Sequence, residues 1–307
     1  MAGVFVFSED LALARQLLTP ALELKASLGE PLVALTTSEA GAKELAALGA
    51  DRAIWLKTEA APEQLALALA DLLGKEQASV VLVGGTLRGK HVASQVAARL
   101  DAAMATDAKT LKIADGKLEI TRVLYAGLAV AEEVLVLPAV ATVPARTFLP
   151  PSAVAQAGAV ETVELAGDAR VTITAVTATG NEGVDISAAS MLVSIGRGFR
   201  KQDDVKLAAD LAGAIKAELA CTRGIAEDEH WLPIERYIGI SGQTVKPELY
   251  LAVGLSGQVQ HMVGCRESKL IVAVNNDERA PIFEAADYGI VGDLYQVLPL
   301  LTAALKN

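Results

Sequence analysis

The stretch Ser79-Val-Val-Leu-Val-Gly-Gly-Thr-Leu-Arg88 has the pattern of a strand, a glycine turn and the start of a helix, and strands alternate with helices in this way through much of the 307-residue chain. Its apolar, β-branched run predicts a buried strand over Val80–Val83, and two glycines end that strand. From Arg88 to about Leu100 the residues have the spacing of a helix. Further runs of the same kind, separated by segments of helical length, occur at Val4–Phe7, Leu32–Thr36 and Ala53–Leu56. This alternation is typical of a parallel sheet covered by helices on both faces.

Local signals in the first half predict a helix and a hairpin. Thr19 followed by Pro20 predicts the N-cap and first turn of a helix over Ala21–Leu28, and Gly29 predicts its end. Beyond Lys109, apolar residues alternate on both sides of Asp115-Gly116, a dipeptide suited to a tight hairpin turn. We therefore expect an antiparallel patch within the parallel scheme, and one more strand over Val171–Val176.

A polar stretch separates two α/β halves. Residues Thr179–Ser187 combine Gly, Asn and acidic side chains and predict a boundary between domains 1–187 and 188–307. After it the alternation restarts, and the elements predicted there are strands at Met191–Ile195, Leu249–Val253 and Leu270–Val274, a helix at Asp203–Leu219, a short helix from Gly257 and a helix from Asp293. The predicted fold class is therefore α/β, with two domains, each a mainly parallel sheet with flanking helices.

The composition excludes several classes of protein. Hydrophobic residues make up 52% of the chain and aromatic residues only 4%, so the cores are aliphatic and intrinsic disorder is excluded. Lys and Arg number 27 against 37 Asp and Glu, and the resulting formal charge of −10 disfavours nucleic acids and anionic membrane surfaces as partners. The longest nearly apolar run, Val134–Val143, is too short to cross a bilayer, so no membrane insertion is expected.

The N-terminus and the cysteines indicate a cytoplasmic protein. Met1–Asp10 contains no Lys or Arg, unlike the start of a secretory or transit peptide. Cys221 and Cys265 are too few for a disulfide framework in a chain of this length, and they do not have the spacing of metal ligands. We therefore expect the reducing environment of the cytosol and no bound metal.

The second half contains glycine loops that follow apolar strands. In Leu249–His261 the strand leads into two glycines around Ser256, and His261 follows one turn later, which predicts a cradle for a phosphate or cofactor. The spacing fits neither the G-x-S-x-G nucleophile motif nor the G-x-G-x-x-G dinucleotide motif. Arg197 follows an earlier strand in a Gly-Arg-Gly loop, and Arg223 precedes Gly224. Each arginine alone is equally consistent with a surface salt bridge, but the two together point to a bound anion.

The order of these motifs resembles the FAD-binding domain of the electron-transfer flavoprotein alpha subunit. The segments that carry the resemblance are Gly196-Arg197-Gly198, Thr222-Arg223, Gly239–Gly242, Pro247–Tyr250, Ser256–His261, Val274–Asp277, Ala280–Phe283 and Ala286–Leu294. The short N-terminus and the sequence Glu-Leu-Ala-Cys-Thr-Arg are most similar to the prokaryotic branch, which includes subunits associated with carnitine metabolism.

The resemblance implies a function as an electron carrier, not as an enzyme with its own substrate. It implies a heterodimer with a beta subunit, which the N-terminal domain would contact, and FAD held mainly by the C-terminal domain. Electrons would come from an acyl-CoA dehydrogenase or a similar flavoenzyme and pass to a quinone- or ferredoxin-linked acceptor.

The resemblance also assigns residues to FAD. They are Arg197, Thr222, Arg223, Gly239, Ser241, Gly242, Ser256, Gly257, Gln258, Val259, Gln260, His261, Asn275, Asp293 and Leu294. By position, Arg197 would approach the phosphates or the ribityl chain, and Thr222 with Arg223 would lie at the flavin ring. Ser256–His261 would follow the pyrophosphate, the ribityl chain and the ring edge. Asn275 and Asp293-Leu294 would hold the adenosine end.

Two of these residues have a predicted electrostatic role. Arg223 would place a permanent cation near the ring and so raise the flavin potential. His261 would donate an N–H to flavin O2 and stabilise the charge that arrives on one-electron reduction.

One loop departs from the family pattern, which usually reads Gly-Gln-Thr-Gly with the Thr hydroxyl near flavin N5. Here the central residues are Ile240 and Ser241, so the hydroxyl is kept and the polar contacts of the Gln are lost. Thr222 stands where the family often has Ser, which keeps that hydroxyl too. Two other classes remain open from the residues alone: a nicotinamide-dependent oxidoreductase, for which no motif supplies a catalytic acid or base, and a structural nucleotide-binding subunit.

Overall fold

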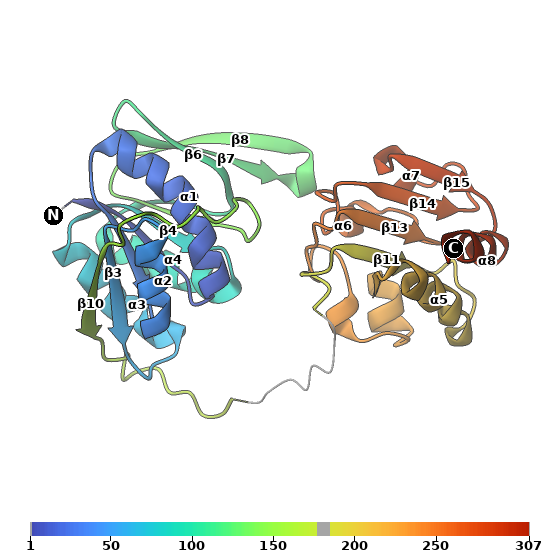
Figure 1. The fold of residues 1–307 in the computed structure, drawn as a ribbon, viewed down its shortest axis with the longest axis horizontal. Helices are drawn as coiled ribbons and strands as arrows, with labels where there is room; N and C mark the ends of the chain where they lie inside the picture. The colour runs from blue at the N-terminus through green and yellow to red at the C-terminus, as the bar shows by residue number, and fades with distance from the viewer. Residues whose placement is uncertain (1, 177–184, 307) are drawn as a thin grey trace. The chain divides into compact units, whose positions relative to one another are not determined.

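The computed structural model describes residues 2–176 and 185–306, which form two compact units, residues 1–175 and 176–307 (Figure 1). Most of the predicted boundary, Thr179–Ser187, lies outside the described residues, so the division between 187 and 188 stays a prediction. Within that stretch, Ile186 is described and packs into the core of the second unit.

The first unit is a doubly wound parallel sheet, as the alternation predicts. Its strands are β1 (Gly3–Phe7), β2 (Leu32–Thr36), β3 (Arg52–Lys57), β4 (Ala78–Gly84), β5 (Ala103–Ala105), β9 (Ala139–Val143) and β10 (Ala159–Glu164). They lie in the order β10-β3-β2-β1-β4-β9-β5, with parallel pairing throughout. Buried side chains of α1 (Leu11–Leu28) and α2 (Glu39–Ala47) pack on one face, and those of α3 (Pro62–Lys75) and α4 (Leu87–Leu100) pack on the other.

The predicted start of the first helix is wrong. Helix α1 begins at Leu11 and contains Pro20, and its N-cap is Asp10, whose carboxylate accepts hydrogen bonds from the backbone N–H groups of Ala12 and Leu13. The apolar face of the helix continues past Pro20 and buries Leu17 and neighbouring residues against the sheet. This packing offsets the loss of the backbone hydrogen bond that Pro20 cannot donate. The predicted end is confirmed, because Gly29 has a left-handed φ of 69° and donates to the Lys25 carbonyl.

The predicted hairpin is confirmed. Strands β6 (Ala108–Ala114), β7 (Lys117–Leu124) and β8 (Ala129–Leu135) form a separate antiparallel sheet. Asp115 and Gly116 connect the first two strands with φ values of 49° and 70°, as a two-residue turn of this kind requires.

The strand predicted at Val171–Val176 is not formed. These residues form irregular, exposed chain, without a strand partner among the described residues. The strand that does join the sheet is the earlier β10, which pairs with β3 at the sheet edge and alternates apolar and charged residues.

The second unit is a five-stranded parallel sheet. Its strands are β11 (Met191–Ile195), β12 (Glu218–Cys221), β13 (Leu249–Val253), β14 (Ile271–Asn275) and β15 (Tyr288–Val291), in the order β12-β11-β13-β14-β15. Helices α5 (Val205–Ile215) and α8 (Leu294–Leu305) cover one face, and the short helices α6 (Val259–Met262) and α7 (Ile282–Ala285) contribute to the cover of the other. The helix predicted to reach Leu219 ends at Ile215, because Lys216 adopts a left-handed conformation and the chain enters β12.

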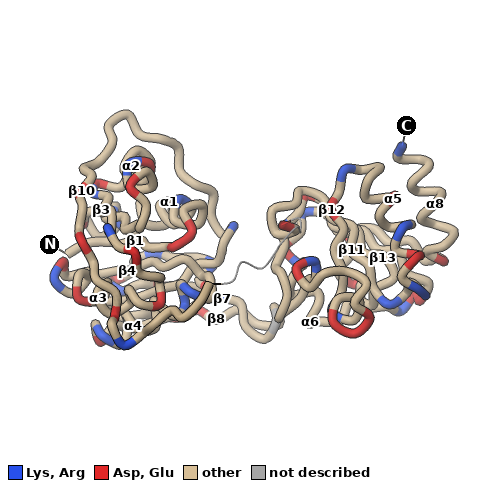
Figure 2. The backbone as a smooth tube through the Cα atoms, turned by 90° about the horizontal axis from the view of Figure 1, so that it is seen from below, with Lys and Arg blue, Asp and Glu red and all other residues tan. Residues whose placement is uncertain are grey.

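Charged residues of both signs are interspersed on each unit (Figure 2). None of the helices in the described part of the chain combines the length and apolarity that a membrane crossing requires.

Cys221 and Cys265 are buried free thiols, and burial raises the pKa of each to about 12, so both are inert. The described residues contain no cluster of His, Cys, Asp or Glu able to hold a metal ion.

Candidate cofactor site

A pocket of about 570 Å³ lies in the second unit, at the loops that follow β11, β12, β13 and β14. The chain runs from β11 to β12 on one side and later to β13 on the other, and this reversal of strand order is where parallel α/β sheets bind ligands. The pocket is lined by Gly196, Arg197, Gly198, Thr222, Arg223, Gly224, Asp228, Tyr237, Ile240, Ser241, Gly254, Leu255, Ser256, Gly257, Gln258, Gln260, His261 and Asn275.

Glycines allow two of these loops to pack backbone against backbone. The Gly198 N–H donates to the Gly254 carbonyl at 2.8 Å. A Cβ atom on Gly198 would lie 2.7 Å from Gly254 Cα, and one on Gly196 would lie 2.7 Å from the Gly254 carbonyl oxygen. A side chain at either position would therefore push the loops apart and deform the pocket.

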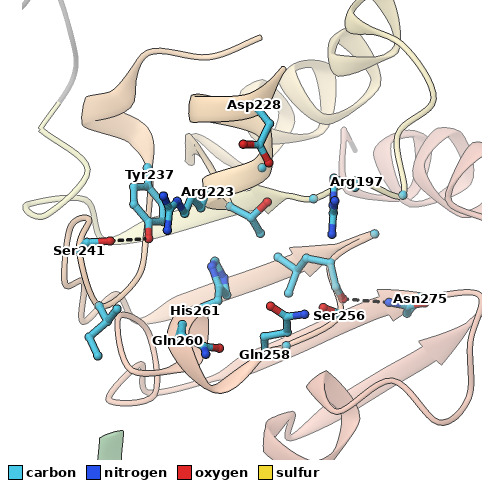
Figure 3. A pocket seen from close by; sticks show the side chains of 18 residues that line it. Arg197, Arg223, Asp228, Tyr237, Ser241, Ser256, Gln258, Gln260, His261 and Asn275 are labelled. Atoms are coloured by element: carbon cyan, nitrogen blue, oxygen red, sulfur yellow. Dashed lines mark hydrogen bonds between the residues drawn. The ribbon is translucent and has the colours of Figure 1, made fainter. Parts of the chain in front are cut away.

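Arg223 reaches the pocket from the end of β12. It directly precedes a π-helix, η3 (Gly224–Asp228), a form of helix that is frequent at functional sites. Its Nε lies 2.6 Å from an oxygen of Glu227, one turn on, so this cation is partly neutralised by a carboxylate. Asp228 contributes a second carboxylate to the neighbourhood, and Figure 3 shows it on the same wall.

Arg197 supplies a cation without a carboxylate partner among the described residues. It follows β11, and its side chain packs over Gly224, where a Cβ would lie 3.1 Å from Arg197 Cδ. Figure 3 shows its guanidinium extending into the pocket toward the side on which Ser256 and Asn275 lie. An unpaired guanidinium beside hydroxyl and amide groups is suited to binding an anion.

The loop Gly239–Gly242 contributes only its central residues to the pocket. The Ser241 hydroxyl lies 3.1 Å from that of Tyr237, and the exposed Ile240 side chain also lines the pocket. Gly239 and Gly242 pack against Tyr237 and are absent from the lining. These two predicted residues thus shape the loop and do not face the pocket.

The loop after β13 and helix α6 form the opposite wall. Gly257 has a left-handed φ of 77° and packs so closely on Ile282 that a Cβ would lie 2.5 Å from its Cα. Ser256, Gln258 and Gln260 line the pocket, whereas Val259 does not.

His261 lines the same wall, but both its ring nitrogens have protein partners. Nδ1 lies 2.9 Å from the Ile238 carbonyl oxygen, and Nε2 lies 2.6 Å from the Tyr250 hydroxyl. Burial, opposed by the bond to the carbonyl, lowers the pKa of His261 to about 4. The ring is therefore neutral near pH 7, and the expected N–H for flavin O2 is not available in this arrangement.

The predicted adenosine end adjoins the pocket. A smaller hollow of about 110 Å³ contains Asp293 and Leu294 and shares Gly198, Gly254 and Asn275 with the larger pocket. Asn275 Nδ2 donates to the Leu255 carbonyl at 2.8 Å, so this amide also holds the loop after β13 in place.

Comparison with known proteins identifies the family. The model described as "Electron transfer flavoprotein FAD-binding domain" matches residues 185–266, which include most of the pocket, and "Electron transfer flavoprotein domain" matches residues 11–168. This chain belongs to the electron transfer flavoprotein alpha family. It is 42% identical to Protein FixB of Escherichia coli strain UMN026 and of Shigella flexneri, over 99% of this chain and 98% of each relative. It is 46% identical to Protein FixB of Escherichia coli strain IAI39 over 80% of both chains.

The cofactor of this alpha-family chain is FAD, and the residues present fit it. The glycine-lined cradle brings backbone close to a ligand, Arg197 offers a cation for phosphate, and hydroxyl and amide side chains are suited to the ribityl chain and the flavin edge. The pocket has the volume expected of a small-molecule site, and the adjoining hollow extends it.

Sequence reasoning did not select several lining residues of this flavoprotein. Asp228 ends the π-helix η3 and Tyr237 follows a 3-10 turn, both after β12, where no strand or glycine motif marks them. The available signal was their position between Arg223 and the Gly239–Gly242 loop, both of which were predicted to reach the cofactor.

Proposed function

We propose that this chain is the FAD-carrying alpha subunit of a cytoplasmic heterodimer with a beta subunit. The heterodimer takes electrons from an acyl-CoA dehydrogenase-type flavoenzyme and passes them to a quinone- or ferredoxin-linked acceptor. The observation that supports it most is the pocket at the strand-order reversal, which brings Arg197, Arg223 and a series of neutral donors together within the matched FAD-binding domain. The similarity to proteins named FixB favours the branch associated with carnitine metabolism.

The proposed roles follow the order of the pocket wall in Figure 3. Arg197 binds the phosphates or the ribityl chain, and Ser256–His261 follow the chain toward the ring. Thr222, Arg223 and Ser241 lie at the ring, and Asn275 with Asp293-Leu294 binds the adenosine end. Bound FAD supplies the redox chemistry, while the cations and donors of this chain favour negative charge on the ring and so set its potential.

Exposed apolar side chains support the proposed pairing with a beta subunit. In the antiparallel sheet, β8 is an edge strand, and its outward-facing Val130 and Val134 are 66% and 58% exposed. Tyr125 and Leu128, in the β7–β8 connection, are more exposed still. An unprotected apolar edge of this kind is normally covered by another chain.

The test is the visible spectrum and the reactivity of the purified heterodimer. We expect an oxidised flavin spectrum with one FAD per alpha chain, bleached by substrate plus an acyl-CoA dehydrogenase and unchanged by reduced nicotinamide. Bleaching by nicotinamide alone would favour the dehydrogenase alternative. A colourless complex that cannot be reconstituted with FAD would favour a structural subunit.

A further inference from the structure

Tyr237 is a buried residue, only 4% exposed, that also lines the pocket. It lies next to the end of β12, where its backbone forms a parallel bridge with Cys221. Its N–H donates to the Ile234 carbonyl at 3.0 Å, and its carbonyl accepts from the Gln243 N–H at 2.7 Å. These backbone contacts fix the position of Tyr237 without any contribution from a cofactor.

The Gly239–Gly242 loop wraps closely around the Tyr237 ring. A Cβ atom on Gly239 would lie 3.0 Å from the Tyr237 hydroxyl oxygen, and one on Gly242 would lie 2.8 Å from its Cδ1. A side chain at either position would therefore crowd the ring. In this arrangement the Tyr237 hydroxyl oxygen lies 3.1 Å from that of Ser241, a contact drawn as a dashed line in Figure 3.

The surroundings of the Tyr237 hydroxyl favour one direction for this hydrogen bond. A phenol is a stronger acid than an aliphatic alcohol, so Tyr237 is the better donor of the two. The Arg223 side chain lies beside Tyr237 in Figure 3, and a guanidinium offers no acceptor to a phenol proton. The hydrogen bond with Glu227 is the main cause of the raised pKa of Arg223, and electrostatic attraction to Tyr237 adds to it. The cation thus attracts the phenol oxygen, and the phenol proton points away from it, toward Ser241.

The Ser241 side chain depends on this contact for its orientation. In the described part of the chain its hydroxyl has Tyr237 as its hydrogen-bond partner, and the residue is otherwise exposed at the pocket. A serine at an exposed loop position can occupy three staggered rotamers. Acceptance of the phenol proton selects one of them and leaves the serine's own proton free for donation. Ser241 therefore presents a donor to the pocket, and Tyr237 determines where that donor lies.

We propose that Tyr237 is a positioning residue, which donates to Ser241 and so directs the Ser241 O–H toward the cofactor. The ligand that this donor suits has an edge that accepts a hydrogen bond and gains negative charge on reduction, as a flavin ring does. The inference rests on the proposed function for the identity of that ligand. The hydrogen bond between Tyr237 and Ser241 is a property of this chain alone.

The hydrogen bond itself can be tested by NMR of the full-length chain labelled with tyrosine that carries ¹³C at Cζ. The chain has five tyrosines, and the signal that disappears in Tyr237→Phe is that of Tyr237. Ser241→Ala removes the acceptor, so the Tyr237 signal should move while that of the exposed Tyr288 stays in place. A Tyr237 signal that does not move in Ser241→Ala would overturn the proposal, with or without bound FAD.

The second arm measures FAD affinity and midpoint potential in the heterodimer, for the unaltered protein, Tyr237→Phe, Ser241→Ala and the double variant. Tyr237→Phe should weaken FAD binding by up to about tenfold and lower the potential, because the Ser241 donor is no longer held in place. In the Ser241→Ala background, Tyr237→Phe should change neither quantity, since the residue through which it acts has lost its hydroxyl. The matched control is Tyr288→Phe, at a residue 67% exposed in the same unit, which should leave both quantities unaltered.

Two results of this arm would contradict the proposal. Equal effects of Tyr237→Phe with and without the Ser241 hydroxyl would show that Tyr237 acts by packing alone. A higher potential in Tyr237→Phe would show that Ser241 donates to Tyr237, so that the phenol withholds this proton from the flavin. If even the unaltered heterodimer binds no FAD, the proposed function fails, and the NMR arm still decides whether Tyr237 holds Ser241.

Discussion

The two parallel sheets of this chain both reverse their strand order, and the reversal in the second unit carries a pocket lined by cations. In the first unit the reversal lies between β1 and β4, where the Thr86 hydroxyl donates to the Glu9 carboxylate and the Gly85 N–H donates to the Val143 carbonyl at 2.8 Å. In the second unit it lies between β11 and β13, and Arg197 with the glycine loops surrounds a pocket of about 570 Å³. The topology offers the same location twice, and the side chains decide whether it can receive an anionic cofactor.

The most direct way to break this comparison is to separate the two units. Residues 1–176 expressed alone should be colourless and should take up no FAD, because a carboxylate occupies the corresponding location and would repel phosphates. Absorbance at the flavin bands after incubation with FAD and gel filtration measures the uptake. Flavin retained by this fragment, at a level similar to the full chain, would refute the placement of the cofactor in the second unit.

The glycine contact between the loops should be nearly as decisive. Gly198→Ala places a methyl group 2.7 Å from the Gly254 backbone, so we expect FAD to be lost from the purified protein. The matched control is Gly213→Ala in α5, where a Cβ has open space and the change should stabilise the helix by about 0.5–1 kcal/mol. The flavin-to-protein absorbance ratio of each variant checks the first expectation, and urea unfolding checks the second. Equal FAD content in both variants would show that the close backbone packing is dispensable.

Sequence reasoning predicted most of the sheet strands because their residues are β-branched and buried on both faces. It missed β5, β9, β10, β12 and β15. Among these, the edge strands β10 and β12 mix apolar with charged residues, and their strand conformation depends on pairing with β3 and β11. It placed the start of α1 at Thr19-Pro20 because a proline usually marks a first turn, whereas the core contacts of this helix extend to its Asp10 cap.

The candidate site shows the same division between local and tertiary information. The glycine loops and Arg197 could be predicted because their motifs are contiguous in sequence. The partners of His261 could not, since Ile238 and Tyr250 are brought to the ring by the packing of α6 on the sheet. The expected N–H donor to the flavin was therefore inferred from the helix turn alone, without the two groups that occupy the ring.

The buried histidine should make the second unit begin to lose stability at a higher pH than the first unit, in which the pKa is lowered for carboxyl groups such as Glu76, Glu161 and Asp168. Because the pKa of His261 is about 4 in the folded protein and about 6.5 when unfolded, the unfolded chain binds the additional proton between these values. The free energy of unfolding should thus fall as the pH falls from about 6.5 to 4, by at most about 3 kcal/mol. In a Trp55→Phe background, the fluorescence of Trp231 reports the unfolding of this unit. His261→Gln in that background should flatten the pH dependence of the free energy of unfolding. An equally steep fall in His261→Gln would assign this pH dependence to other groups.

The apolar edge of the first unit should matter for assembly and not for FAD contacts. Val134→Asp puts a charge on the exposed face of β8, and we expect about tenfold weaker binding of the beta subunit, the loss that one desolvated apolar contact typically causes. Val160→Asp, on the edge strand β10 of the other sheet, is the matched control. Isothermal titration of each variant with purified beta subunit measures the difference. Equal affinities would direct attention to the other exposed apolar residues.

The smallest expected effect concerns Arg223, the pocket cation that is paired with Glu227. It is also the effect that most sharpens the contrast between the two units. Arg223 lies at the pocket but shares its charge with Glu227, so its field on the ring is weaker than that of an isolated guanidinium. Arg223→Ala should lower the flavin midpoint potential by roughly 30 mV, which is tenfold in the equilibrium constant of a two-electron couple, and Arg223→Lys should lower it by less. Glu227→Gln should shift the potential in the opposite direction, because it removes the carboxylate and leaves the cation. Spectroelectrochemical titration of the three variants measures these shifts. If Glu227→Gln lowered the potential as Arg223→Ala does, the pair would act by shaping the π-helix, and the charge of Arg223 would not be what tunes the flavin.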